Sequence, residues 1–110
     1  MSSPANTPVE DSTVQSELVQ AAIADPMRIV VMQHLLAEGE ASVPDLTELA
    51  SEAIATRQPT DHDRVRAAVC LRIDHFPDLT RKGLISISDE TVSLEFLPGS
   101  TIRELKQAIQ

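Results

Sequence analysis

The spacing of apolar residues changes at Gly83, and this change constrains the fold more than any other feature of the sequence. Before Gly83, residues 65–76 carry apolar side chains three or four positions apart, as on one face of an α-helix. After Gly83, Ile85 and Ile87 alternate with serines, as on one face of a β-strand. Pro77 interrupts the helical pattern, and Gly83 ends it. The sequence therefore predicts a long helix, a short helical turn at Pro77 and then a strand.

The alternating pattern continues further along the chain, where Val92, Leu94 and Phe96 are separated by Ser93 and Glu95. Asp89-Glu90 is the predicted turn, so the two strands form a hairpin with one apolar face. A two-stranded hairpin is not stable alone in water. We therefore expect its apolar face to pack against the helices.

Two shorter helices are predicted before the long one. Asp25-Pro26 supplies an N-cap and a first-turn proline, and Gly39 ends this first helix. Ser42 caps a second helix that ends near Thr56, and Thr60 with Asp63 forms a capping box at the start of the long helix. The order of helix, helix, long helix and hairpin predicts a mainly α domain of the winged helix-turn-helix class, in which the long helix is offered to DNA.

Weaker patterns flank this unit. Residues 1–13 are rich in Ser, Thr and Pro and predict a disordered arm, so the domain is expected to span residues 14–110. Helices are predicted at Val14–Ala24 and Thr101–Ile109. They have two interpretations: they cover the rear of the domain, or they form a two-fold interface between two copies. Because so small a core gains from a partner, we predict a homodimer through these helices.

One segment contains His75, Phe76, Pro77, Leu79 and Gly83. With these residues it resembles the small winged-helix DNA-binding proteins of haloarchaea, which are of the ArsR-like type. The resemblance covers roughly residues 25–97 and implies a winged-helix fold and a role in transcription regulation. The sequence departs from the usual pattern at Phe76 and Asp78, where Leu and Lys are expected. This departure from the pattern weakens the case for DNA contacts near that turn.

The charge of the chain is unusual for a DNA-binding protein. There are 17 acidic and nine basic residues, a formal net charge of −8, and Lys82 and Lys106 are the only lysines. A dense carboxylate surface keeps a protein hydrated in concentrated salt, where phosphate attraction is screened in any case. We therefore interpret the chain as halophilic and archaeal. The alternative is an ordinary acidic protein that does not touch DNA.

Positive charge is concentrated in residues 57–82, which hold six of the nine bases and four acids. This segment coincides with the predicted recognition helix and predicts contacts to double-stranded DNA. Arg64, near the helix start, is the best candidate for reading bases. The full set of predicted DNA-binding residues is Arg57, Gln58, Thr60, Arg64, Arg66, Ala67, Leu71, Arg72, Arg81, Lys82 and Thr91.

The expected orientation of the long helix leaves a second function open. If the apolar stripe faces inward, the outward stripe has one base and two acids, which suits a major groove poorly. An exposed Leu71 would suit a protein partner instead, so the alternative function is an interaction module that does not bind DNA. The expected inward residues are Val65, Val69, Ile73 and Phe76, and the expected outward residues are Asp63, Arg64, Ala67, Leu71 and Asp74.

Several function classes are not favoured by the sequence. The single cysteine, Cys70, excludes an internal disulfide, and the chain shows no export signal and no apolar run of membrane-spanning length, so a cytoplasmic location is expected. His34, His62 and His75 lack the close spacing of metal ligands. No phosphate-binding glycine loop or nucleophile motif is present, and two Phe with no Tyr or Trp argue against base stacking. We predict no enzyme activity, no metal and no cofactor.

Overall fold

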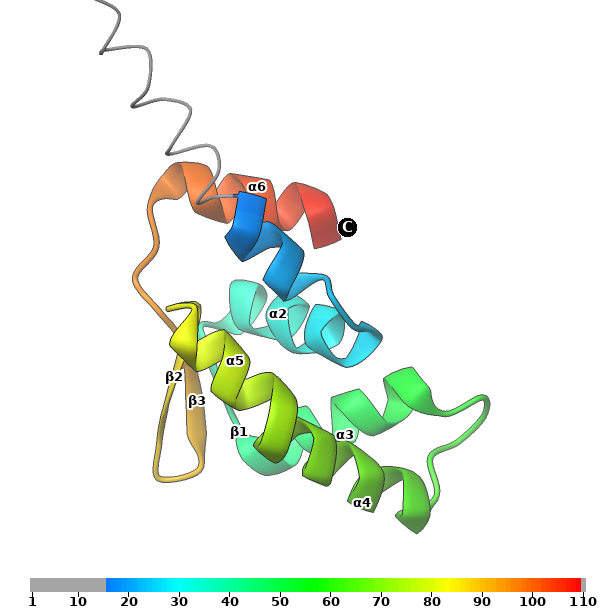
Figure 1. Cartoon of the computed structure of the whole chain (residues 1–110). Helices are drawn as coiled ribbons and strands as arrows, with labels where there is room; N and C mark the ends of the chain where they lie inside the picture. Colours follow the sequence, from blue (N-terminus) through cyan, green and yellow to red (C-terminus); the bar gives the residue numbers. More distant parts are fainter. Residues whose placement is uncertain (1–15, 110) are drawn as a thin grey trace, which may run out of the picture.

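A computed structural model describes residues 16–109, which form a mainly helical structure with a small antiparallel sheet (Figure 1). The predicted arm at residues 1–13 and the first residues of the predicted helix at Val14–Ala24 lie outside the described residues. The elements are a helical stretch at 16–22, α2 (Pro26–Glu38), β1 (Glu40–Ser42), α3 (Val43–Ile54), α4 (Asp61–Cys70), a π-helical turn η2 (Leu71–His75), α5 (Phe76–Arg81), β2 (Ile85–Ser88), β3 (Thr91–Leu94) and α6 (Gly99–Ile109).

The predicted ends of α2 and the predicted start of α4 are confirmed by their capping geometry. Asp25 accepts a hydrogen bond from the Met27 N–H at 2.8 Å and caps α2, while Gly39 ends α2 at a φ of 89° that favours glycine. Thr60 and Asp63 form a reciprocal capping box at the start of α4. These ends depend on side chains within a few positions along the chain, which is why the sequence reveals them.

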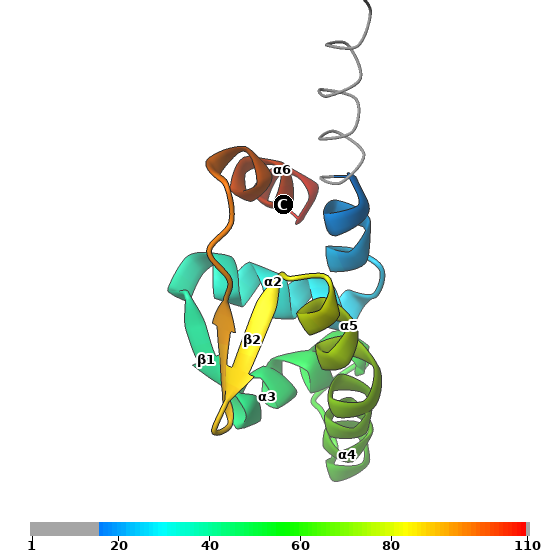
Figure 2. The same ribbon diagram turned by 60° about the vertical axis from the view of Figure 1, so that its left-hand side comes forward.

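The sheet contains one strand more than the sequence predicts. β1 pairs with β3, and the sheet order is β1-β3-β2, all antiparallel (Figure 2). A three-residue strand is too short to produce a visible alternation. The predicted hairpin is confirmed, with Asp89 and Glu90 at φ values of 51° and 66° in its two-residue turn. However, Phe96 is fully exposed in the linker after β3, so its predicted packing is wrong.

The long helix runs through Pro77 without breaking, because a π-helical turn precedes the proline. In this turn the Phe76 N–H donates to the carbonyl of Leu71, five positions earlier. Proline has no N–H, and its ring collides with the carbonyl four positions earlier in a regular α-helix. A wider turn accommodates the ring, so α4, η2 and α5 follow one another directly.

The predicted orientation of this helix is wrong for most of its length. Ala67 and Leu71 have no exposed surface, whereas Val65, Val69 and Ile73 are 62%, 49% and 74% exposed. Leu71 and Phe76 share the buried face although they are five positions apart, because the π turn changes the helical phase. Apolar side chains occupy both faces of the helix, so spacing alone does not distinguish them. Of the expected inward residues, Phe76 is the one that is buried.

The two flanking helices pack on the same chain. Both lie on the side of α2 that faces away from α3 and α4 (Figures 1 and 2). Ala22 and Leu105 are fully buried, and Gln33 of α2 donates to the Ile109 carbonyl at 3.3 Å. α6 begins at Gly99, two residues before the predicted start. Their apolar faces cover the rear of the domain, so they no longer argue for a dimer, which stays a prediction. No helix within residues 16–109 has the length and apolar character needed to cross a membrane.

Candidate nucleic-acid interface

The outward side of α4 and η2 is a mixed surface of aliphatic and basic side chains. It consists of Val65, Arg66, Val69, Arg72 and Ile73, all of them exposed, and is called the α4 face below. The predicted outward stripe had one base and two acids, but this face has two bases and no acid. The electrostatic objection to a DNA-binding helix is therefore reduced but not removed, because one of the two bases, Arg72, is paired with Glu90.

Arg64, the predicted base-reading residue, is turned toward α3. Its Nε donates to Glu48 Oε1 at 2.9 Å, and its Nη1 donates to Asp61 Oδ1 at 3.2 Å. The hydrogen bond to Glu48 is the main cause that raises the pKa of Arg64 above its ordinary value. Its guanidinium is held by two carboxylates, so Arg64 connects α4 to α3.

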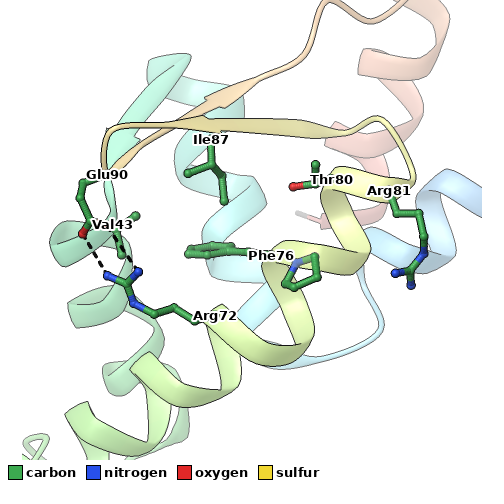
Figure 3. Close-up of a pocket in the computed structure, with 8 residues that line it drawn as sticks. Val43, Arg72, Phe76, Thr80, Arg81, Ile87 and Glu90 are labelled. Carbon is green, nitrogen blue, oxygen red and sulfur yellow. Dashed lines mark hydrogen bonds and ion pairs between the residues drawn. The ribbon is translucent and has the colours of Figure 1, made fainter.

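Arg72 connects the helix to the hairpin. It donates through Nη2 and Nη1 to the two carboxylate oxygens of Glu90, at 2.9 and 3.4 Å (Figure 3). The backbone carbonyl of Glu90 accepts from the Val43 N–H at 2.8 Å. The hairpin turn is thereby fixed to η2 on one side and to the start of α3 on the other.

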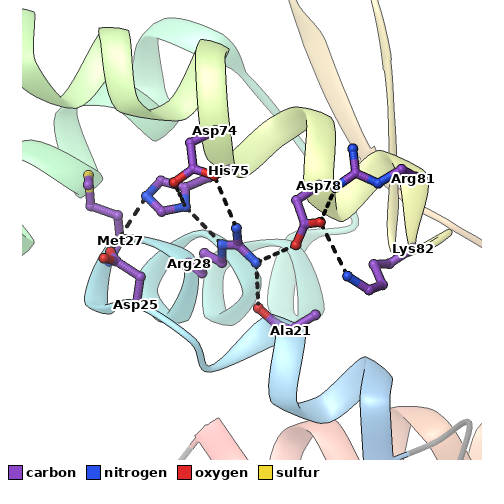
Figure 4. A network of polar contacts seen from close by, with 9 residues as sticks. All are labelled: Ala21, Asp25, Met27, Arg28, Asp74, His75, Asp78, Arg81 and Lys82. Carbon is purple, nitrogen blue, oxygen red and sulfur yellow. Dashed lines mark hydrogen bonds and ion pairs between the residues drawn. The ribbon is translucent and has the colours of Figure 1, made fainter.

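Arg81 and Lys82 both bind Asp78 at the outer side of a polar network (Figure 4). The network has a buried centre, Arg28, which is 7% exposed. Arg28 Nη1 donates to Asp78 Oδ2 at 2.8 Å. Hydrogen bonds from Arg28 and then Lys82 lower the pKa of Asp78 to about 2. These two predicted DNA contacts therefore share one carboxylate.

Arg28 also joins three helical segments. Its Nε donates to His75 Nδ1 at 2.8 Å, and its Nη1 donates to the Ala21 carbonyl at 3.1 Å. His75 is buried, and its Nδ1 is the unprotonated acceptor in this geometry. Sequence reasoning missed this network. The available signal was Arg28 itself, the only base in the first 56 residues, set among the apolar residues of α2.

The other predicted site residues are dispersed. Ala67 and Leu71 cannot reach a base edge because they have no exposed surface, so the prediction that they contact DNA is wrong. Thr60 caps α4, and Thr91 lies half-buried on β3 opposite Ser42 and Ser88. Arg57 and Gln58 are exposed in the connector before α4. In the part of the chain that the structure describes, neither Arg57 nor Arg66 makes a hydrogen bond or ion pair.

Metal-ligating side chains do not gather in the described structure: residues 16–109 contain no group of three or more His, Cys, Asp or Glu placed to hold a metal ion. Comparison of the chain with protein-family models, curated proteins and solved structures found no match. The resemblance to haloarchaeal winged-helix proteins thus stays a prediction from the residues around Pro77.

Proposed function

We propose that the protein is a winged-helix DNA-binding transcriptional regulator. The observation that carries the proposal is the α4 face, where Arg66 and Arg72 lie beside aliphatic side chains on an exposed helix. The element order α2, β1, α3, α4 and then a β2–β3 hairpin supports a winged helix. In that architecture α4 is the recognition helix and the hairpin is the wing.

The chemistry of the α4 face suits a major groove. An arginine can donate two hydrogen bonds to a guanine edge, and aliphatic side chains contact thymine methyl groups. Arg66 is the preferred base-reading residue in place of Arg64, because it is exposed and has no hydrogen bond or ion pair within the described residues. Arg57 is exposed in the connector before α4 and is the proposed phosphate contact.

Few cations are available for phosphate contacts. Arg64, Arg72, Arg81 and Lys82 are each paired with a carboxylate, and the chain carries a formal net charge of −8. Since each neutralised phosphate adds to the salt dependence of binding, we expect a shallow decrease of affinity with salt. This behaviour is compatible with the proposed halophilic, cytoplasmic setting.

Duplex selection followed by a polarisation titration tests the proposal. Random duplexes are first selected on the full chain, and the selected duplex is then titrated with wild type and variants. Arg66→Ala is expected to cost about 1–3 kcal/mol of binding free energy, which is about a five- to 150-fold loss of affinity. Arg103→Ala is the matched control, because Arg103 is an exposed arginine on α6, away from the α4 face.

DNA binding would be contradicted if no duplex is selected at any salt concentration that preserves the fold. An Arg66→Ala variant that binds as wild type does would contradict the assignment of base reading to Arg66 on the α4 face. A second candidate function is a protein-interaction module. It is favoured by three exposed aliphatic residues spaced four positions apart along the helix, Val65, Val69 and Ile73. Val69→Asp should abolish binding of a protein partner, whereas Arg66→Ala should leave most of that binding intact.

A further inference from the structure

A groove of about 480 Å³ lies between the long helix and the hairpin (Figure 3). This volume is within the range of small-molecule sites, about 300–1,000 Å³. Its floor is apolar: Ile87 points from β2 toward the ring of Phe76, and Val43 adds an aliphatic wall. The lining residues are Val43, Arg72, Phe76, Pro77, Thr80, Arg81, Ile87 and Glu90.

One end of the groove holds a cation that is already bound to a carboxylate. Arg72 is 53% exposed and grips both oxygens of Glu90. The Thr80 hydroxyl is at the other end, and the Arg81 guanidinium turns away toward Asp78. The groove therefore combines an apolar floor with a guanidinium that binds carboxylates in bidentate geometry.

The backbone conformation of Glu90 is unusual for a glutamate. Both turn residues have positive φ, a conformation for which Asn-Gly is preferred, yet the turn is Asp89-Glu90. A glutamate in the left-handed region is unfavourable unless the surroundings hold it there. Arg72 and the Val43 N–H hold it, so the unfavourable turn positions a carboxylate at the rim of the groove.

We infer that this groove binds a small organic carboxylate with an aryl or alkyl body. The body packs mainly against Ile87, which is 42% exposed, since Phe76 beneath it is only 3% exposed, and the carboxylate takes the place of Glu90 on Arg72. The Glu90 carboxylate therefore competes with the ligand carboxylate for Arg72. Binding of this ligand does not depend on the proposed function. The effect of the ligand on DNA binding does rest on the proposed function, because the ligand releases the hairpin turn from η2, next to the α4 face.

The binding test uses 4-phenylbutanoate as the probe and the isotope-labelled full chain without DNA. In an NMR titration, the amides of Phe76, Thr80 and Ile87 are expected to shift in a saturable manner. 4-Phenylbutanamide has the same body without the charge, and inorganic phosphate has charge without the body, so both are expected to bind at least about tenfold more weakly.

Three variants separate this site from unspecific binding. Arg72→Gln should weaken 4-phenylbutanoate binding at least about tenfold, with a smaller loss for Arg72→Lys, which keeps the charge but not the bidentate geometry. Glu90→Gln should strengthen binding about two- to fivefold, because an exposed ion pair is a weak competitor. Arg103→Gln, on α6, is the matched control and should bind as wild type does. Thermal unfolding verifies that each variant is folded.

The inference fails if 4-phenylbutanoate produces no saturable shifts, if Arg72→Gln and Arg72→Lys both bind as tightly as wild type, or if Glu90→Gln binds more weakly. Phosphate binding equal to that of the probe would also overturn it, because the groove would then be a simple anion site. Since no DNA is present, these results are independent of the duplex titrations. A chain that binds the probe but no duplex refutes the proposed function alone.

Discussion

Arg28 shows how one residue can fix the relation between helices. It is a buried cation that reaches the Ala21 carbonyl, His75 and Asp78, so the stretch at 16–22, η2 and α5 converge on α2. A buried charge is costly unless it is paired and its hydrogen bonds are satisfied. No buried side-chain nitrogen or oxygen among the described residues lacks a hydrogen-bond partner. Arg28 therefore contributes to specifying this packing as well as to stability.

Removing Arg28 should destabilise the fold far more than removing a surface arginine that shares its partner. Arg28→Met leaves the buried His75 acceptor without its donor and removes the donor to Asp78 Oδ2, while Arg81 and Lys82 still bind Asp78 Oδ1. The expected cost is about 3 kcal/mol of unfolding free energy. Arg81→Met removes an arginine that also binds Asp78 but is exposed, with an expected cost below about 1 kcal/mol. Urea unfolding measures both. Equal effects would show that burial of Arg28 is unimportant.

Asp78 should make stability depend on pH in the acid range. Its pKa is about 2 in the folded chain against an ordinary value of 3.8, so the folded state favours the charged form. The stabilisation is fully present above the unfolded value and is lost as the pH falls from 3.8 to about 2. The difference in thermal midpoint between wild type and Asp78→Asn should be constant near neutral pH and should become smaller as the pH falls from 3.8 to about 2. A gap that widens toward low pH would contradict this origin.

Among the elements, the long helix shows how tertiary contacts choose a face. Ala67 and Leu71 pack inward, and Arg64 reaches Glu48 on α3. A small residue such as Ala67 permits a close approach between helices, and the π turn then keeps Phe76 on the same buried side. Val65 and its neighbours on the α4 face are consequently left exposed.

Two alanine substitutions distinguish the observed orientation from the predicted one. Leu71→Ala should cost about 2–5 kcal/mol, because it leaves a cavity in the core. Ile73→Ala, two positions further on, should change the unfolding free energy by no more than about 0.5 kcal/mol because the side chain is exposed. Denaturant unfolding measures both. The opposite order of effects would support the predicted orientation, in which Val65, Val69 and Ile73 face inward.

At the scale of the whole molecule, excess negative charge opposes the compact state. The formal net charge is −8, and residues 57–82 are the only one of the three segments 1–56, 57–82 and 83–110 with a positive balance. Self-repulsion of this kind is screened by salt, with a Debye length of about 10 Å at 0.1 M and about 3 Å at 1 M. Screening also weakens the exposed ion pairs, such as Arg72–Glu90, but each of these contributes little.

Stability should therefore rise with salt. Between about 0.1 M and 1 M KCl, the thermal midpoint is expected to increase, because screened repulsion outweighs the weakened surface pairs. Thermal unfolding followed by circular dichroism measures the midpoint. A charge-reducing variant, Glu95→Gln, which changes an exposed residue with no ion pair in the described structure, should show a smaller increase. A midpoint that falls with salt would mean that attractive pairs dominate.

The sequence determined those parts of the protein that depend on neighbouring residues. The caps at Asp25 and Thr60, the stop at Gly39, the Asp89-Glu90 turn and the change of period at Gly83 are local signals, and all five are found in the structure. They yield the number and order of the main elements, except for the three-residue β1.

Only the tertiary structure decided which surfaces are buried and which cations are available. The orientation of α4, the pairing of Arg64 with Glu48 and the burial of Arg28 with His75 depend on residues 16 to 47 positions apart in the chain. Apolar spacing does not encode such contacts when both faces of a helix carry aliphatic residues. For the same reason the candidate interface is the α4 face and not the predicted surface with Arg64, Ala67 and Leu71. Packing between elements, and not local preference, selected the surface that the protein presents.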